Sequence, residues 1–343
     1  MSKTWVLRTA GERLALKLPL RTLTTIAGLA LFLAVSAFVS LSLGTRDTSP
    51  LAVWQALTGD TELSLIVREI RLPRVLLAIM VGAALGIAGL LLQGLVRNPL
   101  ASPDVIGITT GASAAAVLLL TLGIAPQGSP LLPAGAIAGA FVVALVILAL
   151  AWERHMSPGR LILVGVGIAA AMGALITLML VMSPDTTAMN AYLWLTGSLY
   201  AAQWGDVLGL LPWLVVFLPL ALGSARHLDV MAMGDDMATG LGSTLQRNRL
   251  ILLLAAVALA GSAVAFAGGL SFLGLVAPHM ARNLLRSGSA AMALAAALIG
   301  GLILLFADLV GRIGFLPRDL PAGVFVAGIG APWFVYQLYR LRR

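Results

Sequence analysis

Ten runs of apolar residues, each about as long as a bilayer is thick, constrain this chain more than any other feature of its sequence. A helix needs about 20 apolar residues to cross the roughly 30 Å of membrane hydrocarbon, where its backbone must satisfy its own hydrogen bonds. We predict membrane-spanning helices near residues 23–43, 72–96, 105–123, 131–151, 161–182, 205–223, 250–267, 270–285, 290–310 and 321–339. A shorter helix is expected at 189–200.

The composition supports the same class. Hydrophobic residues make up 60% of the 343 residues, charged residues only 10%, and the mean hydropathy is +1.01. A water-soluble domain of this size could not bury so much apolar surface. The runs are continuous rather than alternating, which excludes barrel strands. The predicted fold class is all-α: a polytopic membrane protein with about ten transmembrane helices, in which a basic segment at 1–22 precedes one transmembrane domain at 23–343.

The distribution of positive charge predicts the orientation. If the amino terminus is cytoplasmic, only six basic residues lie outside, namely Arg46, Arg68, Arg71, Arg74, Arg312 and Arg318. The other sixteen of the 22 lysines and arginines lie inside. This bias follows the positive-inside rule, so both termini are expected in the cytoplasm.

The residues for catalytic chemistry are missing. The sequence has no G-x-x-x-x-G-K-[ST] loop and no lysine after Lys17, so the chain is not expected to hydrolyse ATP itself. It has no cysteine, and His155, His227 and His279 lack carboxylate neighbours at metal-ligand spacing. We therefore expect no catalytic residue, no metal site and no cofactor bound by this chain.

Ionisable residues within the spans are almost absent, although ion-coupled transporters depend on them. Asp308 is the exception. It lies near the outer end of the ninth span, four residues before Arg312, and the favoured interpretation is an i,i+4 pair that reaches the membrane interface. A stand-alone secondary transporter is weakly supported for this reason, and a structural subunit of a membrane enzyme complex is a further alternative.

Glycines recur at spacings of three to four within two of the spans. Gly82, Gly86 and Gly89 lie in one, and Gly165, Gly167 and Gly173 lie in another. Small residues at such spacings let helices approach closely, so these positions are expected to be packing sites. The alternative, that some of them line a translocation path, stays open.

The outer entrance of the second span is basic. Arg68, Arg71 and Arg74 recur at spacing three, and Pro73 suits the first turn of a helix. One interpretation is local pairing with acidic neighbours or lipid headgroups. The other is a docking point for acidic side chains of an extracytoplasmic partner, since guanidinium groups bind carboxylates bidentately. Arg318, before the last span, falls on the same side.

The longest cytoplasmic loop, at about 224–249, contains the sequence MGDDMATGLG. Asp235 and Asp236 are predicted to cap a short helix, with Met237 and Leu241 on one face. Such a helix buries too little to be stable alone, so it packs against the chain itself or against a separate soluble subunit.

Four segments resemble the FecCD family of ATP-binding-cassette importer permeases, which includes vitamin B12, haem and ferric siderophore permeases. They are RLPRVLLAIMVGAALGIAGLLLQGLVRNPLASPDVIGITTGAS, MGDDMATGLG, GGLSFLGLVAPHMAR and LPAGVFVAGIGAPWFVYQL. The resemblance implies ten helices in each of two permease subunits, identical or homologous, with a heterodimer favoured. It also implies two cytoplasmic ATPases that bind ATP and Mg²⁺, an extracytoplasmic binding protein, and a location in the bacterial inner membrane.

The resemblance also implies roles for particular residues. Arg71 and Arg74 are expected to receive glutamates of the binding protein, with Arg318 as a further docking residue. The ATPase-coupling residues it implies are Gly234, Asp235, Asp236, Ala238, Leu241 and Gly242. The cytoplasmic gate is expected at Met156 and Ser157, with Thr109 and Thr110 as neighbours. The cargo it indicates is a ferric siderophore, of the catecholate enterobactin type, with haem or vitamin B12 as the alternatives.

Overall fold

The computed structural model describes residues 4–8, 15–44, 48–152, 157–285 and 287–341. Its elements are β1 (Thr4–Arg8), β2 (Ala15–Pro19), α1 (Leu20–Ser42), α2 (Pro50–Thr58), a π-helix (Ile66–Arg71), α3 (Leu72–Val96), α4 (Ile108–Thr121), α5 (Leu131–Ala151), α6 (Pro158–Val181), α7 (Asp185–Leu195), α8 (Trp204–Met231), α9 (Asp235–Gly240), α10 (Leu245–Ala267), α11 (Leu273–Leu284), α12 (Ser289–Ile313) and α13 (Ala322–Leu341). The two strands pair antiparallel, from Thr4 opposite Pro19 to Arg8 opposite Ala15.

Each of the ten predicted spans coincides with a helix, so the predicted all-α fold is confirmed. Among the described residues, seven helices are long and apolar enough to cross a membrane by length and composition. The other three of the ten are α4, with 14 residues, α11, with 12 residues, and α13, whose apolar part is Ala322–Tyr336. The run at 270–285 gives only the 12 residues of α11, roughly 18 Å, because Gly268 and Phe272 adopt positive φ and interrupt the helix before it.

Helix α3 forms the centre of the molecule. It packs against α8, α10, α11 and α12, and 78% of its apolar window is buried within the chain. It is apolar around its whole circumference, as expected of a helix enclosed by other helices. By contrast, only 11% of the corresponding window of α6 is buried.

Glycines allow the neighbours of α3 to come this close. A Cβ on Gly82 would lie 2.3 Å from the Gly300 carbonyl oxygen of α12, and a Cβ on Gly89 would lie 1.7 Å from the Gly274 oxygen of α11. The predicted packing role of these α3 glycines is confirmed. For Gly167 and Gly173 of α6 it is not met, because no other helix among the described residues lies within 4 Å of a Cβ at either position.

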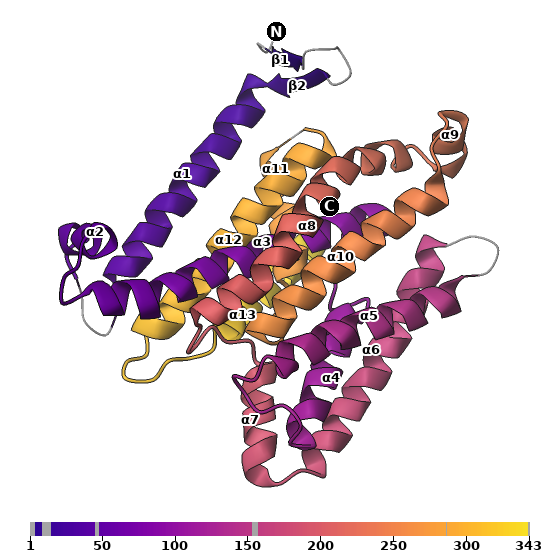
Figure 1. Cartoon of the computed structure of the whole chain (residues 1–343). Coiled ribbons are helices and arrows are strands. Elements are labelled where there is room, and N and C mark those ends of the chain that lie inside the picture. The colour runs from indigo at the N-terminus through magenta and orange to yellow at the C-terminus, as the bar shows by residue number, and fades with distance from the viewer. Residues whose placement is uncertain (1–3, 9–14, 45–47, 153–156, 286, 342–343) are drawn as a thin grey trace.

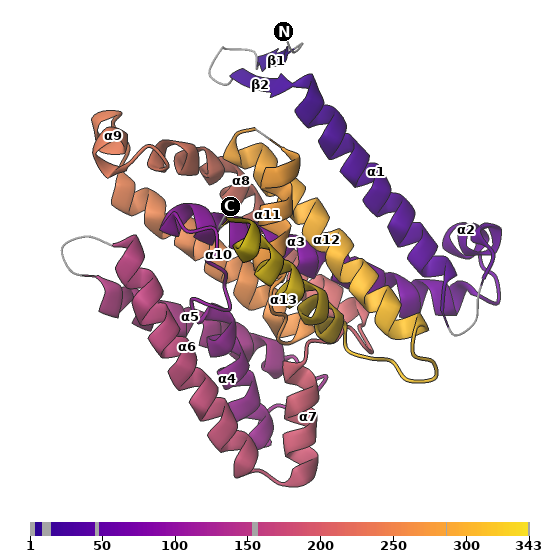
Figure 2. The same cartoon turned by 180° about the vertical axis from the view of Figure 1, so that it is seen from behind.

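The helices fall into groups that Figures 1 and 2 show from opposite sides. Helix α1 lies at one edge along α12, the core helices lie around α3, and α4 to α7 form a group at the other edge, joined to the core mainly through α10. We call the end that carries α9, the last turn of α8 and the start of α12 the α9 end. The opposite end, with α2, the start of α3 and the end of α12, is the α2 end.

The glycine packing generates a stability prediction. Gly89→Ala should lower the free energy of unfolding by about 1–3 kcal/mol, because the added methyl group overpacks the contact between α3 and α11. Gly28→Ala in α1 is the matched control, since a Cβ there meets nothing within 4 Å. Thermal unfolding of the detergent-purified protein measures both. Equal melting temperatures for the two variants would contradict the packing argument.

Candidate functional site

A buried cluster of charges joins three segments at the α2 end. Arg74, in the first turn of α3, donates to both carboxylate oxygens of Asp308 on α12 at 2.8–3.0 Å. The same guanidinium donates to Asp319, in the segment between α12 and α13, at 2.6 and 2.9 Å. Asp308 is 1% exposed and Arg74 is 8% exposed. Two carboxylates around one guanidinium hold α3, α12 and the start of α13 together.

Two further buried arginines connect this cluster to α1. Arg71 donates to the carbonyl oxygen of Leu41 at 2.6 Å and to the Thr48 hydroxyl at 3.1 Å. Arg312 donates to the carbonyl oxygen of Ser40 at 2.7 Å and to its hydroxyl at 3.0 Å. Both arginines bind carbonyl oxygens in the last turn of α1, where a helix has acceptors without intrahelical donors.

The predicted pairing of Asp308 with Arg312 at the membrane interface is wrong. Asp308 lies inside the bundle. Its hydrogen bonds come from Arg74 rather than from Arg312, because α3 packs against α12 and brings the Arg74 guanidinium to the carboxylate. The basic face expected at the entrance of α3 does not form either. The π-helix that precedes α3 directs Arg68 to Asp60 at 3.2 Å, whereas Arg71 and Arg74 have the separate partners described above.

The three predicted docking arginines thus have different surroundings. Arg71 and Arg74 are buried. Arg318 is exposed, in the segment between α12 and α13. Asp319 beside it accepts from Arg74.

At the α9 end, Asp235 connects three helices. It accepts from Arg249 of α10 at 2.8 Å through both carboxylate oxygens and from Arg97 at the carboxyl end of α3. Burial alone would raise the pKa of Asp235, but the hydrogen bonds from Arg249 and Arg97 outweigh it and hold the pKa below its usual value. Asp235 therefore remains a carboxylate at neutral pH and anchors α9 to the core.

The predicted short helix exists, as α9, but its cap differs from the expectation. Gly234 is the N-cap, with φ of 106°, and no side chain caps the helix. Asp235 is instead engaged by the two arginines, and Asp236 is exposed. Ala238 packs inward and is fully buried.

The opposite side of α9 is apolar and uncovered. Met237 is 64% exposed and Leu241, directly after the helix, is 67% exposed. Gly242, at φ of 79°, then turns the chain toward α10. The helix therefore presents two large apolar side chains away from the bundle while its other side is fixed to it.

Of the predicted gate residues that the structure describes, Ser157 lies apart from Thr109 and Thr110. Ser157 precedes α6 and is exposed. Thr109 is buried in α4, and Thr110 donates to the Gly107 carbonyl oxygen at 2.9 Å. The start of α4 lies against Gly165 of α6, roughly 12 Å along that helix from Ser157. Met156 lies outside the described residues.

Sequence reasoning missed the partners of these site residues. Arg97 and Arg249 were assigned only to the basic inner side, yet they fix α9. Asp319, next to Arg318 in the sequence, was not predicted as a partner of Arg74. One signal was present: Asp308 is an isolated acid in an apolar span, and such a group needs a buried partner, for which the arginines at the same end were the candidates.

The comparisons with known proteins identify the family. The profile of the FecCD transport family matches residues 32–340. The chain belongs to this family. As a FecCD member it is a membrane permease subunit of an ATP-binding-cassette importer, and ATP hydrolysis takes place on separate subunits.

Several curated relatives match over most of their length. The achromobactin transport system permease protein CbrC of Dickeya dadantii is 47% identical over 325 residues, which cover 93% of each chain. The Fe(3+)-citrate import permease YfmE of Bacillus subtilis is 44% identical, over 93% of this chain and 95% of that one. The ferric enterobactin permease FepG of Escherichia coli is 40% identical, over 87% and 90%.

The fold also matches a solved structure, an inward-facing conformation of a metal-chelate type ABC transporter. The TM-score is 0.83 at 26% identity, and the match covers 92% of this chain and 99% of that one. Helix packing and sequence thus agree on the family, and the chain is an integral membrane protein that works with ATPase and substrate-binding components.

The Arg74–Asp308 pair generates a stability prediction. Asp308→Asn should lower the free energy of unfolding by about 3 kcal/mol, because it leaves the buried Arg74 short of one counter-charge. The double variant Arg74→Met/Asp308→Leu should recover most of the loss, because both buried charges of the pair are removed together. Chemical unfolding in detergent measures both variants. Asp60→Asn, at a carboxylate that is 98% exposed, is the control and should change stability by less than about 0.5 kcal/mol. A loss for the double variant equal to that of Asp308→Asn would refute this account.

The Asp235 anchor generates a prediction for α9. Asp235→Asn should speed amide hydrogen exchange of residues 235–241 several-fold at neutral pH, whereas Asp236→Asn should not. The pKa of Asp235 is lower in the folded protein than in the unfolded chain. Its stabilisation of α9 is therefore complete above about pH 3.9 and is lost as the pH falls through the folded pKa. Exchange in the unmodified protein, corrected for intrinsic rates, should therefore be unchanged from pH 7 to 5. Equal acceleration by the two variants would contradict the anchor.

Proposed function

We propose that this chain is the permease subunit of an importer that carries a ferric siderophore across the bacterial cytoplasmic membrane into the cell. The relatives named for achromobactin, Fe(3+)-citrate and ferric enterobactin are 40–47% identical to it and match most of their length. Their cargo is iron in chelated form, which supports the class of substrate rather than one chelator. A catecholate is not favoured over other iron chelators, because the achromobactin permease is more similar to this chain than the enterobactin permease is.

Two alternatives are less well supported. A haem permease is the alternative within the family, and the hemin permease HmuU of Yersinia pestis is 34% identical. A stand-alone secondary transporter requires an ionisable group free to bind a cation within the membrane. The intramembrane acid Asp308 is instead held by Arg74 with three hydrogen bonds.

The α9 end is proposed to face the cytoplasm and to bind an ATPase subunit. The observation that carries this proposal is the two-sided character of α9: Asp235 fixes one side to α3 and α10, and Met237 and Leu241 project from the other. Apolar side chains of this size, exposed on an anchored helix, suit a groove on a partner protein. The orientation agrees with the positive-inside rule, which assigns most basic residues to this side.

The α2 end is proposed to face the binding protein. Arg318 is exposed there. Arg74 lies behind it, with Asp319 as its more exposed carboxylate partner. Carboxylates of a docking protein would therefore meet Arg318 first and would compete with Asp319 for Arg74. Arg71 supports the site by holding the end of α1.

Helix α6 is proposed to contact a second permease subunit. It is apolar, mostly uncovered by its own chain, and has room beside Gly167 and Gly173 for another helix. Small residues of this kind permit close helix contacts within a membrane. Between two such subunits the cargo would pass without any covalent chemistry in this chain.

Helix α3 is proposed to connect the two ends during transport. Arg74 lies in its first turn and Arg97 directly after its last, and the 25 residues of the helix span roughly 37 Å. ATP and Mg²⁺ bound by the ATPase subunits would move α9, and Asp235 would pass that movement to α3. The result would be alternating access of the path to the two sides.

Iron uptake with altered α9 tests the proposal. Cells that lack this chain are given back the unmodified protein or the Met237→Glu/Leu241→Glu variant, and uptake of iron-55 bound to citrate, hydroxamate and catecholate chelators and to haem is measured. The unmodified chain should restore uptake of at least one iron chelate. The variant should lose both this uptake and co-purification of the ATPase subunit, because two charges replace the apolar contact.

Leu51→Glu is the matched control, because Leu51 is also 67% exposed but lies in α2, at the other end. It should retain the ATPase subunit. Restored uptake of haem alone would refute the siderophore proposal in favour of the haem alternative. Full uptake by the α9 variant at an equal amount in the membrane would refute the coupling role of α9.

A further inference from the structure

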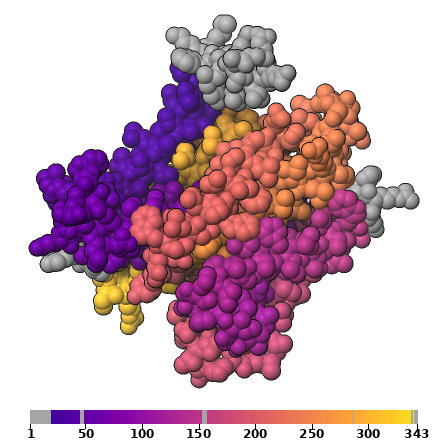
Figure 3. Space-filling model, in the orientation of Figure 1, coloured from indigo at the N-terminus to yellow at the C-terminus, as the bar shows by residue number. Residues whose placement is uncertain are grey.

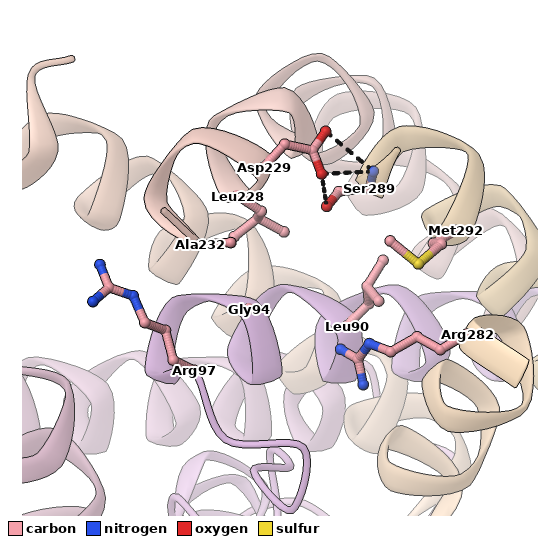
Figure 4. A pocket seen from close by; sticks show the side chains of 9 residues that line it. All are labelled: Leu90, Gly94, Arg97, Leu228, Asp229, Ala232, Arg282, Ser289 and Met292. Carbon is pink, nitrogen blue, oxygen red and sulfur yellow. Dashed lines mark hydrogen bonds between the residues drawn. The ribbon is translucent and has the colours of Figure 1, made fainter. Parts of the chain in front are cut away.

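A cavity of about 300 Å³ lies at the α9 end between α3, α8, α11 and α12. Leu90, Leu228 and Met292 form its apolar part. Arg282 of α11 and Asp229 of α8 supply charges from two different walls (Figure 4). The cavity is separate from the exposed side of α9, so it plays no part in the proposed coupling contact.

Arg282 has a neutral partner only. It is half-buried, and its guanidinium donates to the side-chain oxygen of Gln93 on α3. Within the described part of the chain no carboxylate lies within ion-pairing distance of it. A cation removed from water needs a counter-charge, and four of the five N–H groups of Arg282 remain for an anion beside the one that binds Gln93.

Asp229 supplies the opposite charge to Arg282. Its carboxylate accepts from the Ser289 amide at 3.0 Å and from the Ser289 hydroxyl at 2.6 Å, and so caps α12. No lysine, arginine or histidine of the described residues forms an ion pair with it. The carboxylate of Asp229 is exposed to solvent on one wall of the cavity, and on another wall Arg282 is half-buried without an anion from the described part of the chain.

The depth of the cavity matches a lipid headgroup. Ser289 is the first residue of α12 and Gly94 lies in the last turn of α3, so the cavity lies where spanning helices end. At this level the hydrocarbon gives way to the polar headgroups of the membrane. On the molecular surface, α11 and α12 are visible between α1 and α8 (Figure 3).

We propose that this cavity binds the phosphoethanolamine headgroup of a membrane lipid. The phosphate would accept hydrogen bonds from Arg282 and the ammonium would donate to Asp229, which pairs each unmatched charge of the cavity. The apolar part formed by Leu90, Leu228 and Met292 receives the first methylene groups. The same chemistry occurs in soluble phosphoethanolamine esters, and the experiment separates the two sources.

Arg97 links this cavity to α9. It lines the cavity and its guanidinium binds Asp235. A headgroup in the cavity therefore lies one side chain away from the anchor of α9.

Native mass spectrometry of the full-length protein in detergent tests the proposal. Phosphatidylethanolamine, phosphatidylcholine and phosphatidylglycerol are added separately at equal concentration, and the retained lipid is counted. We expect phosphatidylethanolamine to be retained at least tenfold more than the other two. Arg282→Gln should remove this excess, and Asp229→Asn should remove the preference over phosphatidylcholine and phosphatidylglycerol while its amide oxygen still caps α12.

Arg247→Gln is the matched control, because Arg247 is exposed on α10 and does not line the cavity. It should leave lipid retention unchanged. Competition by glycerophosphoethanolamine at the same concentration as the lipid would support the site and assign it to a soluble ester. Equal retention of all three lipids, or full retention by Arg282→Gln, would overturn the proposal. Iron uptake is not a readout here, so failure of this inference is distinct from failure of the proposed function.

Discussion

The contact between backbones on either side of α3 is the constraint on which the rest of this structure depends. At Gly82 and Gly89 the chain has no room for even a methyl group, because carbonyl oxygens of α12 and α11 occupy that space. Within a membrane, such close contact replaces the hydrophobic effect as the force that holds helices together. Burial of α3 follows from it, and so does the position of everything attached to the two ends of α3.

Electrostatics then determine how those ends are fixed. Arg74 at one end and Arg97 at the other each bind carboxylates from a different part of the chain. Both contacts join segments more than a hundred residues apart in sequence. An apolar bundle alone would leave the α12–α13 segment and α9 without such attachments, since each of them buries little apolar surface. The few charged residues of this chain are thus concentrated where helices need a specific partner.

The sequence was sufficient to predict the helices but not their charged contacts. Apolar length and turn residues are local, so the helix at 131–151 was predicted with its observed limits, and a short helix was predicted in the loop where α9 lies. The later start of α11, at Leu273 rather than at 270, was missed because it arises from the positive φ of Phe272, which is surrounded by apolar residues. Helix α2 was not predicted at all.

The site was harder to predict because its pairs are long-range. Arg74 and Asp308 were both identified as unusual residues, yet their partnership depends on which face of α12 meets α3. The spacing of three among Arg68, Arg71 and Arg74 indicated one basic surface, and the π-helix directs their side chains to separate partners. The gate expected around Ser157 and Thr109 stays a prediction; in this structure the start of α4 lies against Gly165 of α6 rather than against the end of that helix.

The shared carboxylate of Asp235 has a mechanical consequence. Arg97 belongs to the end of α3 and Arg249 to the start of α10; Arg249 binds both oxygens of the Asp235 carboxylate and Arg97 binds one of them. These two helix ends cannot separate without leaving one guanidinium without its anion. A displacement of α9 would therefore move α3 and α10 together as a unit, and relative motion within the molecule would occur where these core helices meet the less buried α6 and α1.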